Sequence, residues 1–268
     1  MAIIKANGLD VFYTEQGAGD ETIVFAHGLL MDTSMWDAVA PEFANHYRVI
    51  CFDFRGQGQT SDPGHGHGYD IDTLVRDTAA FIQAISTKPV HYVGLSMGGM
   101  VGLPLAARHA YLLKSLVLLD TSAQAEPWSN KIKYAIMTVI VKVFGPKPLV
   151  PAMLPLIFGK SSLKNPAVRE VISYWKQKLL ALPKTIVGPV SGVTKRRDVT
   201  NELSKITCPT LMVVGDEDRT TPLSNANNIA AHIANTDLKI IPECGHSSAL
   251  EKPEQVVALM KQFYSRLS

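Results

Sequence analysis

The stretch from Val90 to Gly99 decides the fold, and it reads Val-His-Tyr-Val-Gly-Leu-Ser-Met-Gly-Gly. An apolar run typical of a buried strand passes directly into the pattern Gly-x-Ser-x-Gly, formed by Gly94, Ser96 and Gly98, and a helical run follows. So sharp a reversal strains the backbone at the serine, and side chains at the flanking glycines would collide with neighbouring backbone. We predict that the Ser96 hydroxyl stands above a sheet edge, at a helix N-terminus that favours negative charge.

Around this stretch, short apolar runs alternate with helical patterns, which predicts an α/β fold with crossover helices. Asn7-Gly8, between two apolar pairs, predicts an opening hairpin. Apolar periodicity predicts two helices that cover the sheet, one ending near Ile85 and one near Phe263. Continuous apolar runs predict buried parallel strands at residues 22–26, 47–53, 90–94, 115–119, 210–215 and 238–241.

The alternation stops between Asp120 and Thr210, a gap too long for one crossover and too apolar for a loop without structure. We predict a helical cap inserted at residues 122–198, between core segments 1–121 and 199–268. A first cap helix is expected from the stripe Ile132, Ala135, Ile136, Val139, Ile140 and Val143, and a second, after Asn165-Pro166, from Val168, Val171, Ile172, Trp175 and Leu179.

The predicted cap is basic. It holds 13 Lys or Arg against three acidic residues, whereas the whole chain has a net charge of only +2. A surplus of this kind steers anionic substrates or contacts an anionic surface in some proteins, but lysines on helices more often form a solvated face.

A serine hydroxyl acts as a nucleophile only with a base beside it, and the base needs an acid to hold its tautomer. His246 follows the last predicted strand and is our candidate base. Asp218 follows the penultimate strand and is our candidate acid, beside Asp216 and Glu217, which could be mistaken for it. Asp120, at the end of another strand, is the competing acid.

Acyl transfer also needs N–H donors aimed at the developing oxyanion. Met97 directly follows the nucleophile, and the segment His27-Gly28-Leu29-Leu30 follows an early strand. We predict that the N–H groups of Met97 and Leu29 form the oxyanion hole, with Leu30 as the next choice. His27, beside a glycine, is expected to brace the loop by hydrogen bonding rather than to act as a base.

Several function classes are excluded by composition. The small net charge argues against nucleic acid as a partner, and the widely spaced Cys51, Cys208 and Cys244 indicate no disulfide framework and favour the cytoplasm. Residues 53–61 lack the third glycine of a dinucleotide fingerprint, so we predict no cofactor and expect the segment to tie down a loop. His65 and His67 lack partners at ligand spacing, so we predict no metal site. No run of the chain is expected to span a membrane.

Taken together, the motifs resemble the α/β hydrolase superfamily over nearly the whole core. The segments that carry the resemblance occur in the family's order: His27-Gly28-Leu29-Leu30 with Ser34-Met35-Trp36, residues 53–58, Gly94 to Gly99, Gly215 to Asp218, and Gly245-His246. The resemblance is to the branch with bacterial aryl esterases, cofactor-free haloperoxidases and 3-oxoadipate enol-lactonases. It implies an eight-stranded, mostly parallel sheet with a lid inserted after strand 6. Many relatives have more apolar residues where Arg219-Thr220-Thr221 follows Asp218 here.

We therefore expect a serine hydrolase of small carboxylic esters or lactones that works through an acyl-serine intermediate. The alternatives are an enol-lactonase acting on a carboxylated ring, cofactor-free peroxide or carbon–carbon bond chemistry, and a ligand receptor without catalysis. The oligomeric state stays open. The expected substrate pocket comprises Leu30, Trp128, Met137, Phe144, Met153, Leu156 and Phe158.

Overall fold

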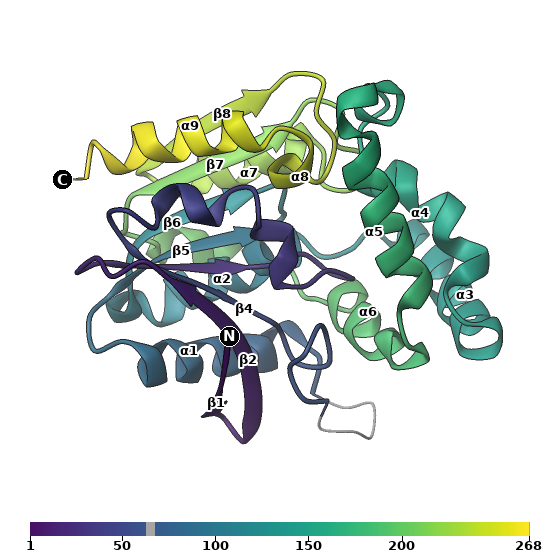
Figure 1. Cartoon of the computed structure of the whole chain (residues 1–268), viewed down its shortest axis with the longest axis horizontal. Helices are drawn as coiled ribbons and strands as arrows, with labels where there is room; N and C mark the ends of the chain where they lie inside the picture. The colour runs from purple at the N-terminus through teal and green to yellow at the C-terminus, as the bar shows by residue number, and fades with distance from the viewer. Residues whose placement is uncertain (63–67, 268) are drawn as a thin grey trace.

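The computed structural model describes residues 1–62 and 68–267, and its centre is an eight-stranded sheet in the order β1-β2-β4-β3-β5-β6-β7-β8 (Figure 1). β2 pairs antiparallel with β1 and β4, and the other neighbouring strands pair parallel, which confirms the expected mostly parallel sheet. The strands are β1 (Ala2–Ala6), β2 (Leu9–Gln16), β3 (Thr22–Ala26), β4 (Arg48–Phe52), β5 (Val90–Leu95), β6 (Leu113–Leu119), β7 (Thr210–Gly215) and β8 (Thr236–Ile241).

The central strands are buried on both faces. Every residue of β3, β5 and β7 is buried, which explains why these strands appear in the sequence as continuous apolar runs. The expectation that residues 238–241 are equally buried is wrong, because β8 is an edge strand and the Ile240 side chain is 49% exposed. Asn7 (φ 48°) and Gly8 (φ 77°) form the predicted turn between β1 and β2.

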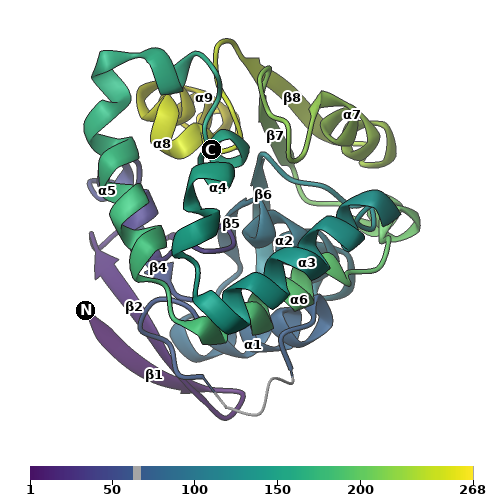
Figure 2. The ribbon, with the colours of Figure 1, turned by 90° about the vertical axis from the view of Figure 1, so that its right-hand side faces the viewer.

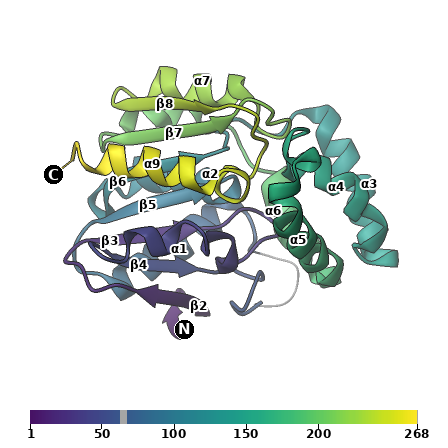
Figure 3. The same cartoon turned by 45° about the horizontal axis from the view of Figure 1, so that its top comes forward.

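Helices cover both faces of the sheet, and each face has its own apolar core. On one face pack α1 (Ile71–Ile85), α2 (Met97–Arg108) and α7 (Leu223–His232). On the other pack α8 (Ser248–Glu251) and α9 (Pro253–Tyr264), and Figure 3 shows α9 in front of the sheet. Short 3-10 helices are η1 (Thr33–Trp36), η2 (Ala40–Phe43), η3 (Ala110–Leu112), η4 (Lys147–Leu149), η5 (Ser162–Lys164), η6 (Pro166–Val168), η7 (Lys184–Ile186) and η8 (Thr200–Lys205).

Four helices connect β6 to β7 and lie together beyond one end of the sheet (Figures 1 and 2). They are α3 (Trp128–Phe144), α4 (Val150–Ile157), α5 (Arg169–Ala181) and α6 (Val187–Thr194), which we call the cap helices. This is the predicted helical insertion after strand 6, and the exact limits 122–198 stay a prediction. The Asn165 side chain accepts the Ala167 N–H at 3.0 Å, which caps the helical turn leading into α5 as expected.

The predicted first cap helix is α3. Four residues of the stripe that predicted it, Ile132, Ile136, Val139 and Val143, are 52–61% exposed. The face that points inward instead carries Tyr134, Met137, Thr138 and Val141. Both faces of α3 are rich in apolar residues, so periodicity alone does not decide which one is buried.

Substitution of Phe25 tests the core beneath the site. Its buried ring lies 4.9 Å from that of Trp36 and 6.3 Å from that of Phe43, between ring centroids. We expect Phe25→Ala to lower the free energy of unfolding by about 3–5 kcal/mol, because it leaves a cavity. The exposed Ile3 is the control, and Ile3→Ala should change stability by less than about 0.5 kcal/mol in the same denaturant titration. Equal losses in the two variants would contradict this account of the core.

Candidate active site

Ser96 lies between β5 and α2 in a strained backbone conformation, with φ 51° and ψ −112°. A Cβ atom on Gly94 would lie 2.4 Å from the carbonyl carbon of Gly98. A Cβ atom on Gly98 would lie 2.2 Å from the carbonyl oxygen of Ala26. Backbone cannot yield at such distances, so both positions require glycine, and the close packing of β3, β5 and α2 fixes the turn that presents Ser96.

The structure brings Ser96, His246 and Asp218 together, although they lie far apart in the sequence. The Ser96 Oγ is 2.8 Å from the Nε2 of His246, and the Nδ1 of His246 is 2.9 Å from the Oδ2 of Asp218. All three residues are buried, but Ser96 and His246 line a pocket. Each follows the carboxyl end of a strand, β5, β8 or β7, so all three meet at one edge of the parallel sheet.

The carboxylate of Asp218 is held by the residues that follow it. Its Oδ1 accepts the N–H groups of Thr220 at 2.8 Å and Thr221 at 2.9 Å, and its Oδ2 accepts the Thr221 hydroxyl at 2.8 Å. Burial opposes the charged form, but the charge of His246 and these hydrogen bonds outweigh burial and lower the pKa of Asp218. The two threonines thus help to keep Asp218 ionised and oriented.

Asp120, the competing acid, makes no hydrogen bond to His246 within the described residues. Its two carboxyl oxygens accept the N–H groups of Gly215 and Ser248, each at 3.0 Å. Burial, together with the nearby charge of Asp218, raises the pKa of Asp120 to about 8. Asp120 therefore joins the end of β7 to the start of α8 instead of orienting the imidazole.

The other acidic neighbours of Asp218 are also directed elsewhere. Glu217 accepts the N–H and hydroxyl of Ser161 at 2.8 and 2.7 Å, which fastens a cap loop to the core. The exposed Asp216 accepts the Cys244 N–H at 3.4 Å.

Glu251 positions the histidine loop, a role that the sequence analysis did not find. Its buried carboxylate accepts N–H groups from Gly245 and Ser247, on either side of His246, at 3.0 to 3.1 Å. It also accepts the N–H of Gly159 in the cap at 2.8 Å. No short motif marks this role in the sequence, because Glu251 acts through backbone N–H groups.

The environment of His246 favours its charged form. Burial disfavours the imidazolium, but the charge and hydrogen bond of Asp218, with further negative charge from Asp120 and Glu251, raise the pKa of His246 above its usual value. Such a histidine accepts a proton readily from a hydroxyl beside it.

Two N–H groups beside Ser96 are free to bind an anion. Within residues 1–62 and 68–267, neither the N–H of Leu29 nor that of Met97 donates a hydrogen bond to the protein. The Leu30 N–H, in contrast, donates to the Gln57 Oε1 at 2.8 Å, so Leu30 is unsuited as the second donor. Leu30 has φ 69°, and this left-handed backbone turns the loop beside the pocket.

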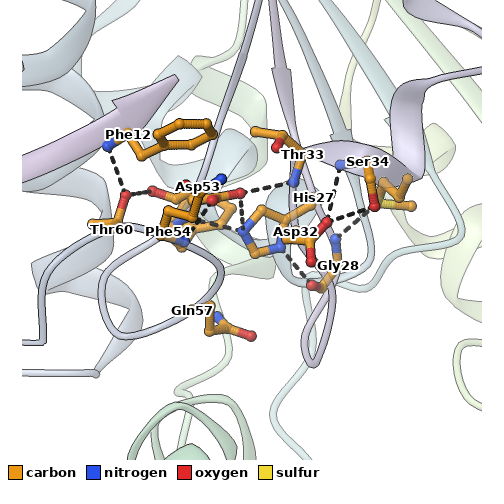
Figure 4. A network of polar contacts seen from close by, with 12 residues as sticks. Phe12, His27, Gly28, Asp32, Thr33, Ser34, Asp53, Phe54, Gln57 and Thr60 are labelled. Carbon is orange, nitrogen blue, oxygen red and sulfur yellow. Dashed lines mark hydrogen bonds and ion pairs between the residues drawn. The ribbon is translucent and has the colours of Figure 1, made fainter. Parts of the chain in front are cut away.

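A buried network braces this loop from below, with His27 and Asp53 at its centre (Figure 4). The Nδ1 of His27 lies 2.7 Å from the Gly28 carbonyl oxygen, and its Nε2 accepts the Phe54 N–H at 3.0 Å. Burial lowers the pKa of His27, so the ring is neutral and donates from Nδ1. Asp53 accepts the Thr33 N–H at 2.7 Å. The prediction that His27 braces the loop is confirmed.

The pocket above Ser96 is enclosed mainly by apolar side chains of the cap helices. Four of the seven predicted pocket residues line it: Leu30, Met137, Met153 and Leu156. Leu29, predicted as an oxyanion donor, also lines it. Residues that the sequence analysis missed include Met100, Tyr134, Val141, Leu149, Leu182, Ile186, Val187 and Val190. They could not be assigned because the packing of α3 and α6 over the sheet is a tertiary feature that no local pattern records.

Three predicted pocket residues are elsewhere. Trp128 and Phe144, at the two ends of α3, are 76% and 71% exposed, because the helix turns its other face to the pocket. Phe158 is buried in the apolar core, since the chain leaves α4 at this residue and packs Gly159 against Gly245.

One buried ion pair interrupts the apolar wall. The Arg196 Nη1 lies 2.7 Å from the Glu126 Oε2, and both side chains are at most 10% exposed. Arg196 also donates to the carbonyl oxygens of Gln124 and Val193. The guanidinium charge at the pocket is therefore balanced by a carboxylate.

Within the described ranges, no group of three or more His, Cys, Asp or Glu side chains is placed to hold a metal ion. His65 and His67 lie outside these ranges. Among the helices described, none is long and apolar enough to cross a bilayer.

A mostly parallel sheet with a serine at a strand-to-helix turn, and an acid and a histidine on later loops, defines a hydrolase of the α/β class. The chain belongs to the alpha/beta hydrolase family, whose sequence profile matches residues 23–259.

Similar proteins fall in the expected branch. The chain is 25% identical to 3-oxoadipate enol-lactonase 2 of Acinetobacter baylyi, over 97% of this chain and 96% of that protein. It is 25% identical to a non-heme haloperoxidase of Rhodococcus erythropolis, over 97% and 98%. Among solved structures, a thermophilic esterase from Thermogutta terrifontis superposes with a TM-score of 0.91 at 26% identity, over 100% of this chain and 99% of that one.

Substitution of Asp218 tests the electrostatics. Asp218→Asn removes the main charge that favours the imidazolium, so we expect an NMR titration to show a lower pKa for His246 than in the unaltered protein. Asp216→Asn removes a carboxylate two residues away that does not contact His246, and should leave this pKa unchanged. An unaltered titration in Asp218→Asn would assign the controlling charge to another group.

Proposed function

We propose that this chain is a serine hydrolase of carboxylic esters with apolar acyl groups, acting through an acyl-serine intermediate. The observation that carries the proposal is the pair of hydrogen bonds that link Ser96 to His246 and His246 to Asp218. Ser96 and His246 line an apolar pocket. Its membership of the alpha/beta hydrolase family and its likeness to an esterase support the same reaction class.

In the first half of the reaction, the Ser96 Oγ attacks the ester carbonyl carbon while the Nε2 of His246 takes the hydroxyl proton. The carbonyl π electrons move to oxygen, and the tetrahedral intermediate carries a negative charge there. Asp218 stays ionised and stabilises the imidazolium. His246 then returns the proton to the departing alcohol as the carbon–oxygen bond breaks.

The N–H groups of Leu29 and Met97 are the proposed oxyanion donors. Both are free of protein acceptors among the described residues, and Met97 begins α2, whose dipole favours negative charge. In other enzymes, removal of one such donor lowers kcat by roughly 10²- to 10³-fold.

In the second half, water replaces the alcohol. His246 removes a proton from water, the hydroxide attacks the acyl carbonyl, and the Ser96 oxygen leaves with the proton that His246 returns. The products are a carboxylic acid and the free enzyme, so no cofactor is required.

The pocket indicates the substrate class. Met137, Met153 and Leu156 offer apolar surface, and the charge of Arg196 is balanced by Glu126. An uncharged acyl group gains from this environment, whereas a carboxylate would lose its hydration without an unpaired cation to replace it.

Hydrolysis of a lactone with a carboxylated ring is the second candidate. The basic cap and the similarity to an enol-lactonase favour it. The carboxylate of such a lactone would have to approach Arg196 in competition with Glu126. Lactone hydrolysis is therefore the weaker of the two candidate functions.

Removal of the nucleophile tests the mechanism. We expect Ser96→Ala to lower hydrolysis of an activated aryl ester by roughly 10³- to 10⁶-fold with an unchanged circular dichroism spectrum. Ser265→Ala, at the exposed end of α9, should retain full activity. Intact-mass measurement after fluorophosphonate treatment should give one adduct in the unaltered protein and none in Ser96→Ala. No adduct in the unaltered protein would favour a ligand receptor.

Acyl chain length tests the pocket. We expect kcat/KM for aryl esters to rise from acetyl to hexanoyl by up to about fourfold per methylene, since each buried CH₂ contributes about 0.8 kcal/mol. Met137→Glu should remove this increase, whereas Lys164→Glu, outside the pocket, should preserve it. Faster hydrolysis of a carboxylated lactone, at a rate that falls with added salt, would instead support the second candidate.

A further inference from the structure

The outer face of α3 exposes an unusual amount of apolar surface. Its large exposed side chains are Trp128 (76%), Ile132 (52%), Ile136 (58%), Val139 (61%), Val143 (57%) and Phe144 (71%). Five of them recur every three or four residues from Trp128 to Val143, so they form one continuous stripe along the helix. Isolated exposed apolar residues are ordinary on a protein surface, whereas a continuous stripe marks an interaction surface.

Lysines flank this stripe. On a helical projection, Lys131 and Lys142 lie along one side of it and Lys133 along the other, and α3 contains no acidic residue. No carboxylate lies within ion-pair distance of these three lysines in the described part of the chain. An apolar stripe between unpaired lysines is typical of helices that lie in the surface of a bilayer with anionic lipids.

α3 lies where a flat surface can reach it. It is the outermost helix of the molecule, at the end opposite the C-terminus (Figure 1), and lies in front when that end faces the viewer (Figure 2). Its inner face, with Tyr134, Met137 and Val141, lines the pocket above Ser96. A single helix therefore separates the exposed stripe from the candidate active site.

We propose that the outer face of α3 docks the protein on an anionic lipid bilayer, with the apolar stripe in the headgroup region and Lys131, Lys133 and Lys142 beside lipid phosphates. Residues 122–198 carry a charge of +10 against −8 for the remainder, so only the cap end of the molecule is attracted to such a surface. A second copy is a poorer occupant, since pairing two α3 faces would bring two basic caps together.

Docking through α3 would place the pocket beside the source of an apolar substrate. This consequence rests on the proposed function, because it takes acyl esters that partition into the bilayer as substrates. The docking itself does not, and Ser96→Ala protein should bind vesicles as well as the unaltered protein does. A failure of docking is therefore distinguishable from a failure of ester hydrolysis.

Vesicle binding tests the proposal. Phosphatidylcholine vesicles with and without about 30% phosphatidylglycerol are mixed with the full-length protein and sedimented. We expect binding only to the anionic vesicles, with affinity reduced at least about tenfold by Ile136→Glu/Val139→Glu and by Lys131→Glu/Lys133→Glu/Lys142→Glu. None of these residues lines the pocket, so hydrolysis of a water-soluble aryl ester should be unchanged in both variants.

Trp128 supplies a second readout. Of the three tryptophans, Trp36 and Trp175 are buried and Trp128 alone is exposed, so a blue shift of the emission on anionic vesicles reports the environment of α3. Trp128→Phe should lose the blue shift and still sediment.

Matched controls place the same changes away from α3. Ile3→Glu/Ile240→Glu changes two exposed apolar residues of the sheet, and Lys88→Glu/Lys205→Glu/Lys252→Glu alters charge by the same amount as the α3 lysine variant. Both controls should bind like the unaltered protein. Equal binding to neutral vesicles, or equal losses in controls and α3 variants, would overturn the proposal. An absence of vesicle binding would also overturn it. If the protein bound no vesicles but formed dimers that Ile136→Glu/Val139→Glu abolishes, the outer face of α3 would be an interface between two copies instead.

Discussion

The candidate site depends on the close approach of three backbone segments. The carbonyl oxygen of Ala26 in β3 leaves no room for a side chain at Gly98, and Gly98 leaves none at Gly94. With both glycines in place, the turn between β5 and α2 has one outcome: Ser96 takes φ 51°, and its hydroxyl meets His246. The parallel pairing of β5 with β3 and β6 holds Ser96 in its strained conformation. Part of the stability of the central sheet therefore offsets the strain that presents this hydroxyl.

Buried carboxylates organise the rest of the site, each with a different task. Asp218 is kept ionised by the threonines and the imidazole around it, and can therefore stabilise a positive charge. Asp120, close by but fully buried, has its pKa raised to about 8 and joins β7 to α8 through backbone N–H groups. Glu251 ties the histidine loop to the cap. Neighbouring carboxyl groups thus have opposite protonation tendencies. Burial and the charge of Asp218 raise the pKa of Asp120, whereas at Asp218 the charge of His246 and the hydrogen bonds outweigh burial.

These interactions explain which features of the site could be predicted from the sequence. Ser96, Asp218 and His246 could be predicted because each follows a strand in a short motif, and strand ends of a parallel sheet meet at one edge. The pocket wall could not, because it depends on how α3 is rotated. That helix is apolar on two faces, and only the packing of Tyr134, Met137 and Val141 over the pocket leaves Ile136 and Val139 outside. Glu251 was missed for a similar reason, since it acts through backbone contacts that no motif encodes.

The two faces of α3 account for how apolar substrates could reach the pocket. An apolar pocket needs apolar substrates, and such molecules are scarce in water but concentrated in membranes. A helix with one face toward the pocket and the other bearing a stripe from Trp128 to Val143 between lysines connects the two environments over the width of one helix. Burial of that stripe in the cap would have been the ordinary solution for a stable protein, since exposed apolar surface forgoes about 25 cal/mol per Å². Its exposure, together with the unbalanced positive charge of the cap, is explained if a lipid surface completes the burial.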